Sequence, residues 1–146
     1  MDLVYATTML SQGGRGGQMQ SDDGAFKLKL SVPPEMGGAP DATPGPNPEM
    51  LVGGALAAAL DHSVRHIARQ GRLPVKGCYV ESKLSQFQDF EGSYRMALSM
   101  VVYLAGPLDQ PTADDLVQRA QGICPFQAAI KNNVTVNLKA VLDTPA

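Results

Sequence analysis

The sequence lacks the long apolar runs and the charge blocks that mark several classes of protein. Its longest apolar stretches, residues 55–60 among them, are too short to cross a lipid bilayer, and no basic region is joined to a long apolar run. The 14 acidic and 12 basic residues leave a formal net charge of −2 and are mixed along the chain. No basic surface for nucleic acid or anionic lipid is therefore expected. We predict a cytoplasmic protein that binds neither nucleic acid nor membrane.

Cysteine is also scarce, since Cys78 and Cys124 are the only two in the chain. They could form one disulfide, but a domain of this size does not need one for stability, so free thiols are expected. Cys78 lies in a predicted strand with Val80 and Leu84 on its face. This pattern indicates a buried, inert core thiol.

What is present is the composition of one globular domain. The chain has 146 residues, of which 44% are hydrophobic and 18% charged, and no internal repeat divides it. This length is sufficient to bury a core. We therefore expect a single domain over residues 1–146.

The N-terminal third predicts a small antiparallel sheet. β-branched and aromatic residues favour a strand over residues 3–8, and apolar residues alternate with polar ones over residues 25–32. Between them, residues 12–17 form a glycine-rich loop that presents Arg15. Residues 33–46 hold five prolines and three glycines, which predicts an extended connector.

A long helix follows the connector. Asn47 suits the N-cap, Pro48 the first helical position and Glu49 the positive end of the helix, and Gly71 can end it. Residues 53–60 are small and apolar around most of the circumference. They predict a buried central helix, enclosed on several sides.

Beyond this helix, hairpins and short helices predict an α+β fold. No glycine-rich nucleotide-binding turn opens either long helix, and hairpin connections argue against a doubly wound parallel sheet. The expected elements are strands over residues 75–85 and 93–104 with a turn at 88–92, a helix over residues 111–121 capped by Thr112 and ended by Gly122, a half-helix from Cys124-Pro125 through Ile130, and a closing strand with Val134, Val136, Leu138 and Val141.

Four short motifs follow one another along the chain: Gly13-Gly14-Arg15-Gly16, Lys29-Leu30-Ser31-Val32-Pro33, Asn47-Pro48-Glu49 and Cys124-Pro125-Phe126. None is specific alone, but their order and spacing agree with the run of strands and helices. Together they resemble the organic hydroperoxide resistance (Ohr) branch of the OsmC family over nearly the whole chain. The resemblance implies antiparallel sheets packed around a central buried helix in an intertwined homodimer.

The resemblance also implies a site. In the family, a cysteine on the central helix attacks the peroxide, an arginine and a glutamate organise it, and a second cysteine closes a disulfide. An external dithiol of the lipoyl type then reduces the disulfide, and no bound cofactor is implied. By position, Arg15 matches the arginine, Glu49 the glutamate and Cys124 the resolving cysteine. Counting from Asn47 places Ala59 where the peroxide-reacting cysteine belongs.

Ala59 has no nucleophile, and peroxide cleavage needs a thiolate. Whether the chain is an enzyme therefore stays open, as does whether Ala59 is natural or engineered. Asp61 and His62 follow where the branch usually has apolar or small residues, which favours a changed pocket. The alternatives are a hydroperoxide-handling protein, a non-enzymatic protein that binds an apolar small molecule at the dimer interface, and a redox sensor that uses Cys124 alone.

Glu49 and Ala59 are ten positions apart on the predicted helix, a separation of roughly 15 Å, and lie on different faces. If Glu49 reaches the pocket at position 59, it must come from a partner subunit, which agrees with a homodimer.

Several candidate residues also have ordinary structural explanations. Arg15 can be a solvated loop residue, and Glu49 is explained by the helix dipole. His62 and His66 lie one helical turn apart, but a third metal ligand beyond Asp61 is not evident, so no metal is expected. Asp61 and Arg65 have the spacing of an exposed ion pair.

Overall fold

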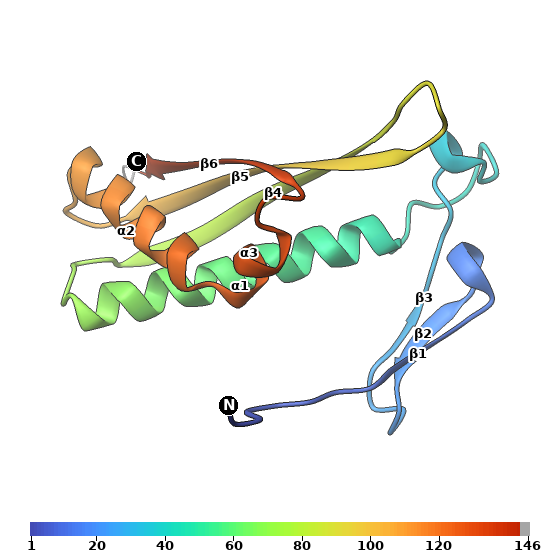
Figure 1. Ribbon diagram of the computed structural model, residues 1–146, viewed down its shortest axis with the longest axis horizontal. Coiled ribbons are helices and arrows are strands. Elements are labelled where there is room, and N and C mark those ends of the chain that lie inside the picture. The colour runs from blue at the N-terminus through green and yellow to red at the C-terminus, as the bar shows by residue number, and fades with distance from the viewer. Residues whose placement is uncertain (144–146) are drawn as a thin grey trace. The chain divides into compact units, whose positions relative to one another are not determined.

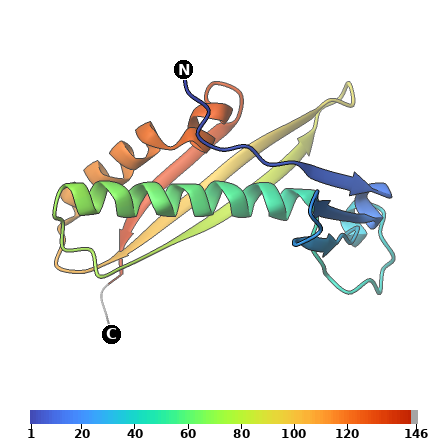
Figure 2. The same ribbon diagram turned by 90° about the horizontal axis from the view of Figure 1, so that it is seen from below.

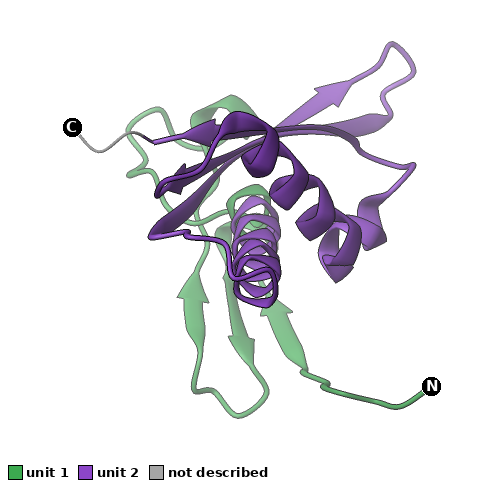
Figure 3. Cartoon of the chain, turned by 90° about the vertical axis from the view of Figure 1, so that its left-hand side faces the viewer, with its two compact units in different colours: residues 1–51 green, residues 52–146 purple. Residues whose placement is uncertain are grey.

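The computed structural model describes residues 1–143. The chain divides into two compact units, Met1–Leu51 and Val52–Ala146 (Figure 3). Each unit is built around its own three-stranded sheet, with strand orders β1-β2-β3 and β4-β5-β6. Helix α1, Pro48–Gln70, begins in the first unit and continues into the second.

The first unit is an antiparallel sheet of short strands. These are β1 (Met9–Gln12), β2 (Gln18–Ser21) and β3 (Lys27–Lys29), with 3-10 turns at Gly14–Gly16 and Pro34–Met36. The turn between β1 and β2 needs glycine, because Gly13 and Gly14 have φ values of 83° and 62°.

The predicted strand at residues 3–8 is wrong, because these residues have no strand partner and β1 starts at Met9. The strand predicted over residues 25–32 is only Lys27–Lys29, and β2 was not predicted. Strand propensity alone does not fix a strand; backbone pairing does, and the Gln-Met-Gln-Ser sequence of β2 pairs on both sides.

The first unit has almost no core of its own. Among its residues, Leu30 is the only hydrophobic side chain that is buried. The structure leaves large apolar side chains of this unit exposed: Leu3, Val4, Tyr5, Met9, Leu10, Phe26, Met36 and Met50. A sheet of three- and four-residue strands with so little burial is marginally stable by itself.

The second unit holds the core. Strands β4 (Gly77–Gln88) and β5 (Tyr94–Ala105) form the predicted hairpin, and β6 (Thr135–Leu142) closes the sheet. Helix α1 and helix α2 (Gln110–Ile123) cover one face of this sheet (Figures 1 and 3). The predicted α+β class is therefore confirmed.

One strand pairing differs from the expected antiparallel sheets, because β6 runs parallel to β5. The reason is the connection between them. Helices α2 and α3 (Pro125–Ile130) carry the chain back along the sheet, and such a crossover brings the next strand in parallel.

Helix α1 starts as predicted. The Met50 N–H donates to Asn47 Oδ1 at 2.8 Å, which makes Asn47 the N-cap, and the helix runs straight to Gln70 (Figure 2). Leu56, Leu60 and Val64 are buried against the sheet. The opposite face is exposed in the single chain, including Gly54, Ala55, Ala58 and His62. The prediction of a helix enclosed on several sides is therefore wrong for the single chain, in which only one side of α1 is buried.

Helix α2 differs from the prediction at both ends. Asp109, rather than Thr112, is the N-cap, because its side chain accepts from the Thr112 N–H at 2.9 Å. Gly122 does not end the helix, which continues to Ile123, because Gly122 does not adopt the left-handed conformation of a terminating glycine. The short helix predicted after Cys124-Pro125 is confirmed.

Ser82 on β4 is an exception in a well-satisfied core. Its hydroxyl is the only buried side-chain polar atom without a hydrogen-bond partner in residues 1–143, and it faces Gly53 of α1. We expect Ser82→Ala to leave the free energy of unfolding unchanged or raise it by up to about 1 kcal/mol, because an unpaired buried hydroxyl is removed. Denaturant unfolding measures this, with the exposed Ser99→Ala as a matched control. A loss above about 1 kcal/mol would show that the hydroxyl is hydrogen-bonded.

Candidate functional site

Arg15 and Glu49, 34 residues apart in sequence, form a two-pronged ion pair in the first unit. Arg15 Nη1 lies 2.9 Å from Glu49 Oε2, and Arg15 Nη2 lies 2.7 Å from Glu49 Oε1. The glycine-rich turn Gly14–Gly16 presents the arginine, and the first turn of α1 presents the glutamate. Arg15 is therefore a paired residue of a built site rather than a loop arginine that contacts only solvent.

The pair has a defined charge state. The hydrogen bonds from Arg15 lower the pKa of the Glu49 carboxyl below its ordinary value of 4.5. The carboxylate side chain is 17% exposed, whereas the arginine is 41% exposed. Arg15 Nη1 also lies 3.8 Å from Met36 Sδ, on the 3-10 turn of the connector. A fixed guanidinium with a charged carboxylate behind it can orient a polar group and favour a nearby thiolate.

This ion pair predicts a pH dependence of stability. Because the folded pKa of Glu49 is depressed, the contribution of the pair is present above pH 4.5 and is lost as the pH falls through the lower folded pKa. We expect Glu49→Gln to reduce the free energy of unfolding at pH 7 by less than about 1 kcal/mol, since solvent screens the pair, and the difference to vanish in acid. Unfolding curves from pH 7 to acid for both proteins measure this. A difference that does not change with pH would contradict the assignment.

The two remaining predicted site residues belong to the second unit. Ala59 is partly buried on α1, and its carbonyl accepts a hydrogen bond from Ser63 Oγ at 3.0 Å. Cys124 is a free, fully buried cysteine that caps α3, with its carbonyl accepting from the Ala128 N–H at 3.0 Å. The structure places both on helical elements that pack on the same sheet, but it does not test their roles.

Cys78 is a free core thiol, as predicted, with an electrostatic environment that the sequence did not indicate. Burial raises its pKa to about 12, and the carboxylate of Asp61 adds to the effect as a hydrogen-bond acceptor. Arg65 pairs with Asp61 at 2.9 Å, which confirms the predicted ion pair, and also donates to the Cys78 carbonyl at 2.5 Å. The cluster therefore ties α1 to β4 and keeps the thiol protonated. Spacing within the helix predicted only the Asp61–Arg65 pair, because β4 comes from elsewhere in the sequence.

His62 and His66 lie on α1 with their rings stacked at a centroid distance of 6.4 Å and an interplanar angle of 23°. Across residues 1–143, no three histidine, cysteine or acidic side chains are grouped so that they could hold a metal ion. Both histidines lie on the exposed side of the helix.

Comparison with known proteins extends the likeness from motifs to the whole fold. The family model described as OsmC-like protein matches residues 38–139. Organic hydroperoxide resistance protein-like 1 of Staphylococcus saprophyticus is 31% identical, over 98% of this chain and 100% of its own.

Two solved structures share the architecture from end to end. An organic hydroperoxide resistance protein OsmC of Legionella pneumophila has a TM-score of 0.86 at 31% identity and covers 95% of this chain and 98% of its own. An organic hydroperoxide resistance protein of Elizabethkingia anophelis has a TM-score of 0.89 at 25% identity and covers 98% and 100%.

The family model spans more than half of the residues, and the sequence relative matches along its full length. The order of strands and helices that frames the Arg15–Glu49 pair is therefore an inherited fold, and the chain belongs to the OsmC family.

Proposed function

We propose that this chain belongs to the organic hydroperoxide detoxification system and the oxidative-stress response, with its site at Arg15, Glu49, position 59 and Cys124. The observation that carries the proposal is the two-pronged Arg15–Glu49 ion pair. These are the two polar residues that the resemblance assigned, and folding brings them into contact. The relatives named for organic hydroperoxide resistance match nearly all of the chain and support the same function.

The parent chemistry needs two thiols and an external reductant. A thiolate attacks the distal peroxide oxygen, the O–O bond breaks, an alcohol leaves, and the sulfur becomes a sulfenic acid. The second thiol displaces water from that sulfur to form a disulfide, and a lipoyl-type dithiol returns the two electrons by thiol–disulfide exchange. No bound cofactor takes part. This chain holds Cys124 for the second step, but Ala59 offers no sulfur for the first.

Neither cysteine replaces the missing thiol. Cys124 is fully buried, and the pKa of about 12 leaves Cys78 almost entirely protonated at neutral pH. In an assay with an organic hydroperoxide and a lipoyl-type dithiol, the chain with Ala59 is expected to show only the background rate. Turnover above background would overturn the assignment of position 59, and Cys78→Ser and Cys124→Ser variants would identify the reacting thiol. Oxidation of Cys124 by mild peroxide would instead support a sensor.

A second candidate function is the binding of an apolar small molecule without catalysis. The observation that favours it is the exposed small-residue face of α1, with Gly54, Ala55 and Ala58, on a chain that has no accessible thiol. Native mass spectrometry of the purified protein tests this candidate. A retained apolar molecule would support this candidate. It would be contradicted if the protein is free of ligand and if Ala59→Cys has peroxidase activity.

We further propose that the chain is a homodimer. The first unit buries only Leu30 among its hydrophobic residues, so its exposed apolar side chains need a second layer, as does the exposed face of α1. A partner subunit would also bring its own Glu49 to position 59, since Glu49 and Ala59 of one chain lie ten positions apart on α1. Light scattering at micromolar concentration should give twice the 15.4 kDa chain mass. A monomer would remove this argument.

The proposed location is the cytoplasm. No helix in residues 1–143 is long and apolar enough to span a bilayer. The free state of Cys78 and Cys124 supports a reducing compartment.

A further inference from the structure

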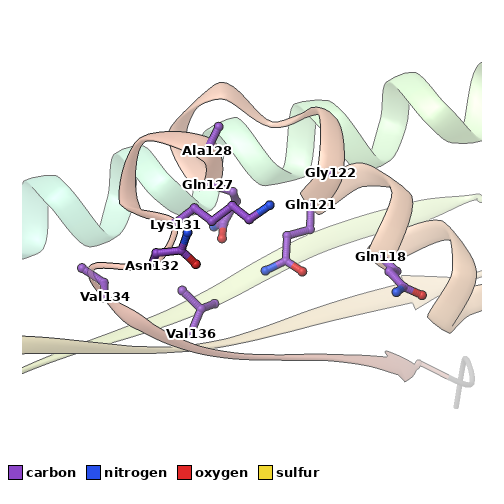
Figure 4. Close-up of a pocket in the computed structure, with 9 residues that line it drawn as sticks. All are labelled: Gln118, Gln121, Gly122, Gln127, Ala128, Lys131, Asn132, Val134 and Val136. Atoms are coloured by element: carbon purple, nitrogen blue, oxygen red, sulfur yellow. The ribbon is translucent and has the colours of Figure 1, made fainter.

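A pocket of about 390 Å³ lies in the second unit, at the junction of the end of α2, helix α3 and the start of β6 (Figure 4). None of the four proposed site residues lines it. Its volume is within the range of small-molecule sites. Its walls carry the carboxamides of Gln118, Gln121, Gln127 and Asn132, and its floor includes Val134 and Val136.

Gln127 gives the pocket a buried polar group that lacks a strong partner. The residue is 5% exposed, and its Nε2 donates to Met100 Sδ at 3.2 Å, which is a weak acceptor. No hydrogen bond from residues 1–143 reaches its amide oxygen, and this oxygen is partly exposed, since Ser82 Oγ is the only fully buried side-chain polar atom without a partner in that range. The oxygen is therefore an accessible acceptor at the pocket wall.

Lys131 gives the pocket its charge. The side chain extends from the end of α3 toward the side on which Gln121 lies (Figure 4), and it forms no ion pair with any described residue. No acidic residue lines the pocket. A neighbouring groove, which shares Gln118 and Gln121, includes Asp114 and Lys139, and the Asp114 carboxylate accepts from Gln110 Nε2 at 2.8 Å. The charge of the pocket itself is therefore that of one lysine.

We propose that this pocket binds a small monocarboxylate that carries a peptide-like amide. The carboxylate pairs with Lys131, the amide N–H donates to the accessible acceptor of Gln127, and the amides of Gln118, Gln121 and Asn132 complete the polar contacts. The valine side chains pack against the aliphatic part of the ligand. This site is independent of the hydroperoxide function, because it uses none of Arg15, Glu49, position 59 or Cys124.

The test compares two probes that differ only in charge, N-acetylglycine and its neutral analogue N-acetylglycinamide. Each is titrated into the full-length protein, and the side-chain amide signals of Gln121 and Gln127 are followed by NMR. We expect saturable shifts with N-acetylglycine and binding about two- to fivefold weaker with the neutral analogue, as for loss of one solvent-exposed ion pair. Equal affinity for both probes, or no saturable shift at all, would overturn the proposal.

Two variants assign the contacts. Lys131→Gln is on the surface and should abolish the preference for N-acetylglycine, whereas Lys83→Gln, an exposed lysine on β4 outside the pocket, should keep it. Gln127→Leu should weaken the binding of both probes. Its thermal unfolding midpoint shows whether the variant is folded. If Lys131→Gln still binds N-acetylglycine more tightly than the neutral analogue, the carboxylate does not pair with Lys131 and the proposal is wrong.

Discussion

Ala59→Cys is expected to turn over organic hydroperoxides well above the rate of the chain with Ala59, with a lipoyl-type dithiol as the electron donor. The reason is that, on the proposed function, the chain carries every side chain of the site except the sulfur at position 59. Arg15 and Glu49 are already paired, and Cys124 is a free thiol. Restoring a nucleophile should raise the rate by on the order of 10³-fold or more, the scale seen when enzymes lose one.

Three controls make this result specific. Ala59→Ser supplies a hydroxyl of similar size but no thiol and should stay at background. Ala59→Cys combined with Cys124→Ser, assayed without added thiol, should consume one equivalent of peroxide and end as a sulfenic acid at position 59 rather than a disulfide, because no second protein thiol is in place to condense with it. If Ala59→Cys is folded but has no peroxidase activity, the hydroperoxide proposal is contradicted and the non-enzymatic binding protein is favoured.

Leu60→Ala should cause the largest loss of stability among simple core truncations of α1. Leu60 is fully buried, in the helical turn after Leu56 and before Val64, and faces the sheet of the second unit. Removing its side chain loses apolar burial and leaves a cavity, which costs about 2 to 5 kcal/mol. Denaturant unfolding at one fixed protein concentration measures it, because dimerisation would make stability depend on concentration.

Ile123→Ala is the matched control, since it deletes the same number of carbon atoms from a side chain that is 50% exposed at the end of α2. We expect a change within about 0.5 kcal/mol. If both variants lose the same stability, α1 does not pack on the sheet as described.

The second half of the fold was predictable because its signals are local and strong. The Asn47 cap, Pro48 and the long periodic segment define α1, and the alternating residues of β4 and β5 define the hairpin. The first unit was predicted poorly. Its strands are three or four residues long, and the residues of β2 have no strong strand propensity, so pairing with β1 and β3 decides their conformation.

The residues of the candidate site were predictable, but the contacts between them were not. Motif order pointed to Arg15, Glu49 and Cys124, and counting along the helix pointed to Ala59. No local pattern could show that Arg15 pairs with Glu49, because the two lie 34 residues apart. The effect of Asp61 on Cys78 was equally hidden, since one residue is on α1 and the other on β4.

The sequence by itself therefore determined the α+β class, the central helix with its cap, the main hairpin, and the lack of a thiol at position 59. Each of these depends on residues close together in the chain or on the identity of one residue. The tertiary structure decided that β6 runs parallel to β5, that Cys124 is inaccessible, that Glu49 is held as a carboxylate by Arg15, and that an amide-lined pocket exists beside Lys131. These features arise from contacts between distant segments, and only folding brings such groups within reach of one another.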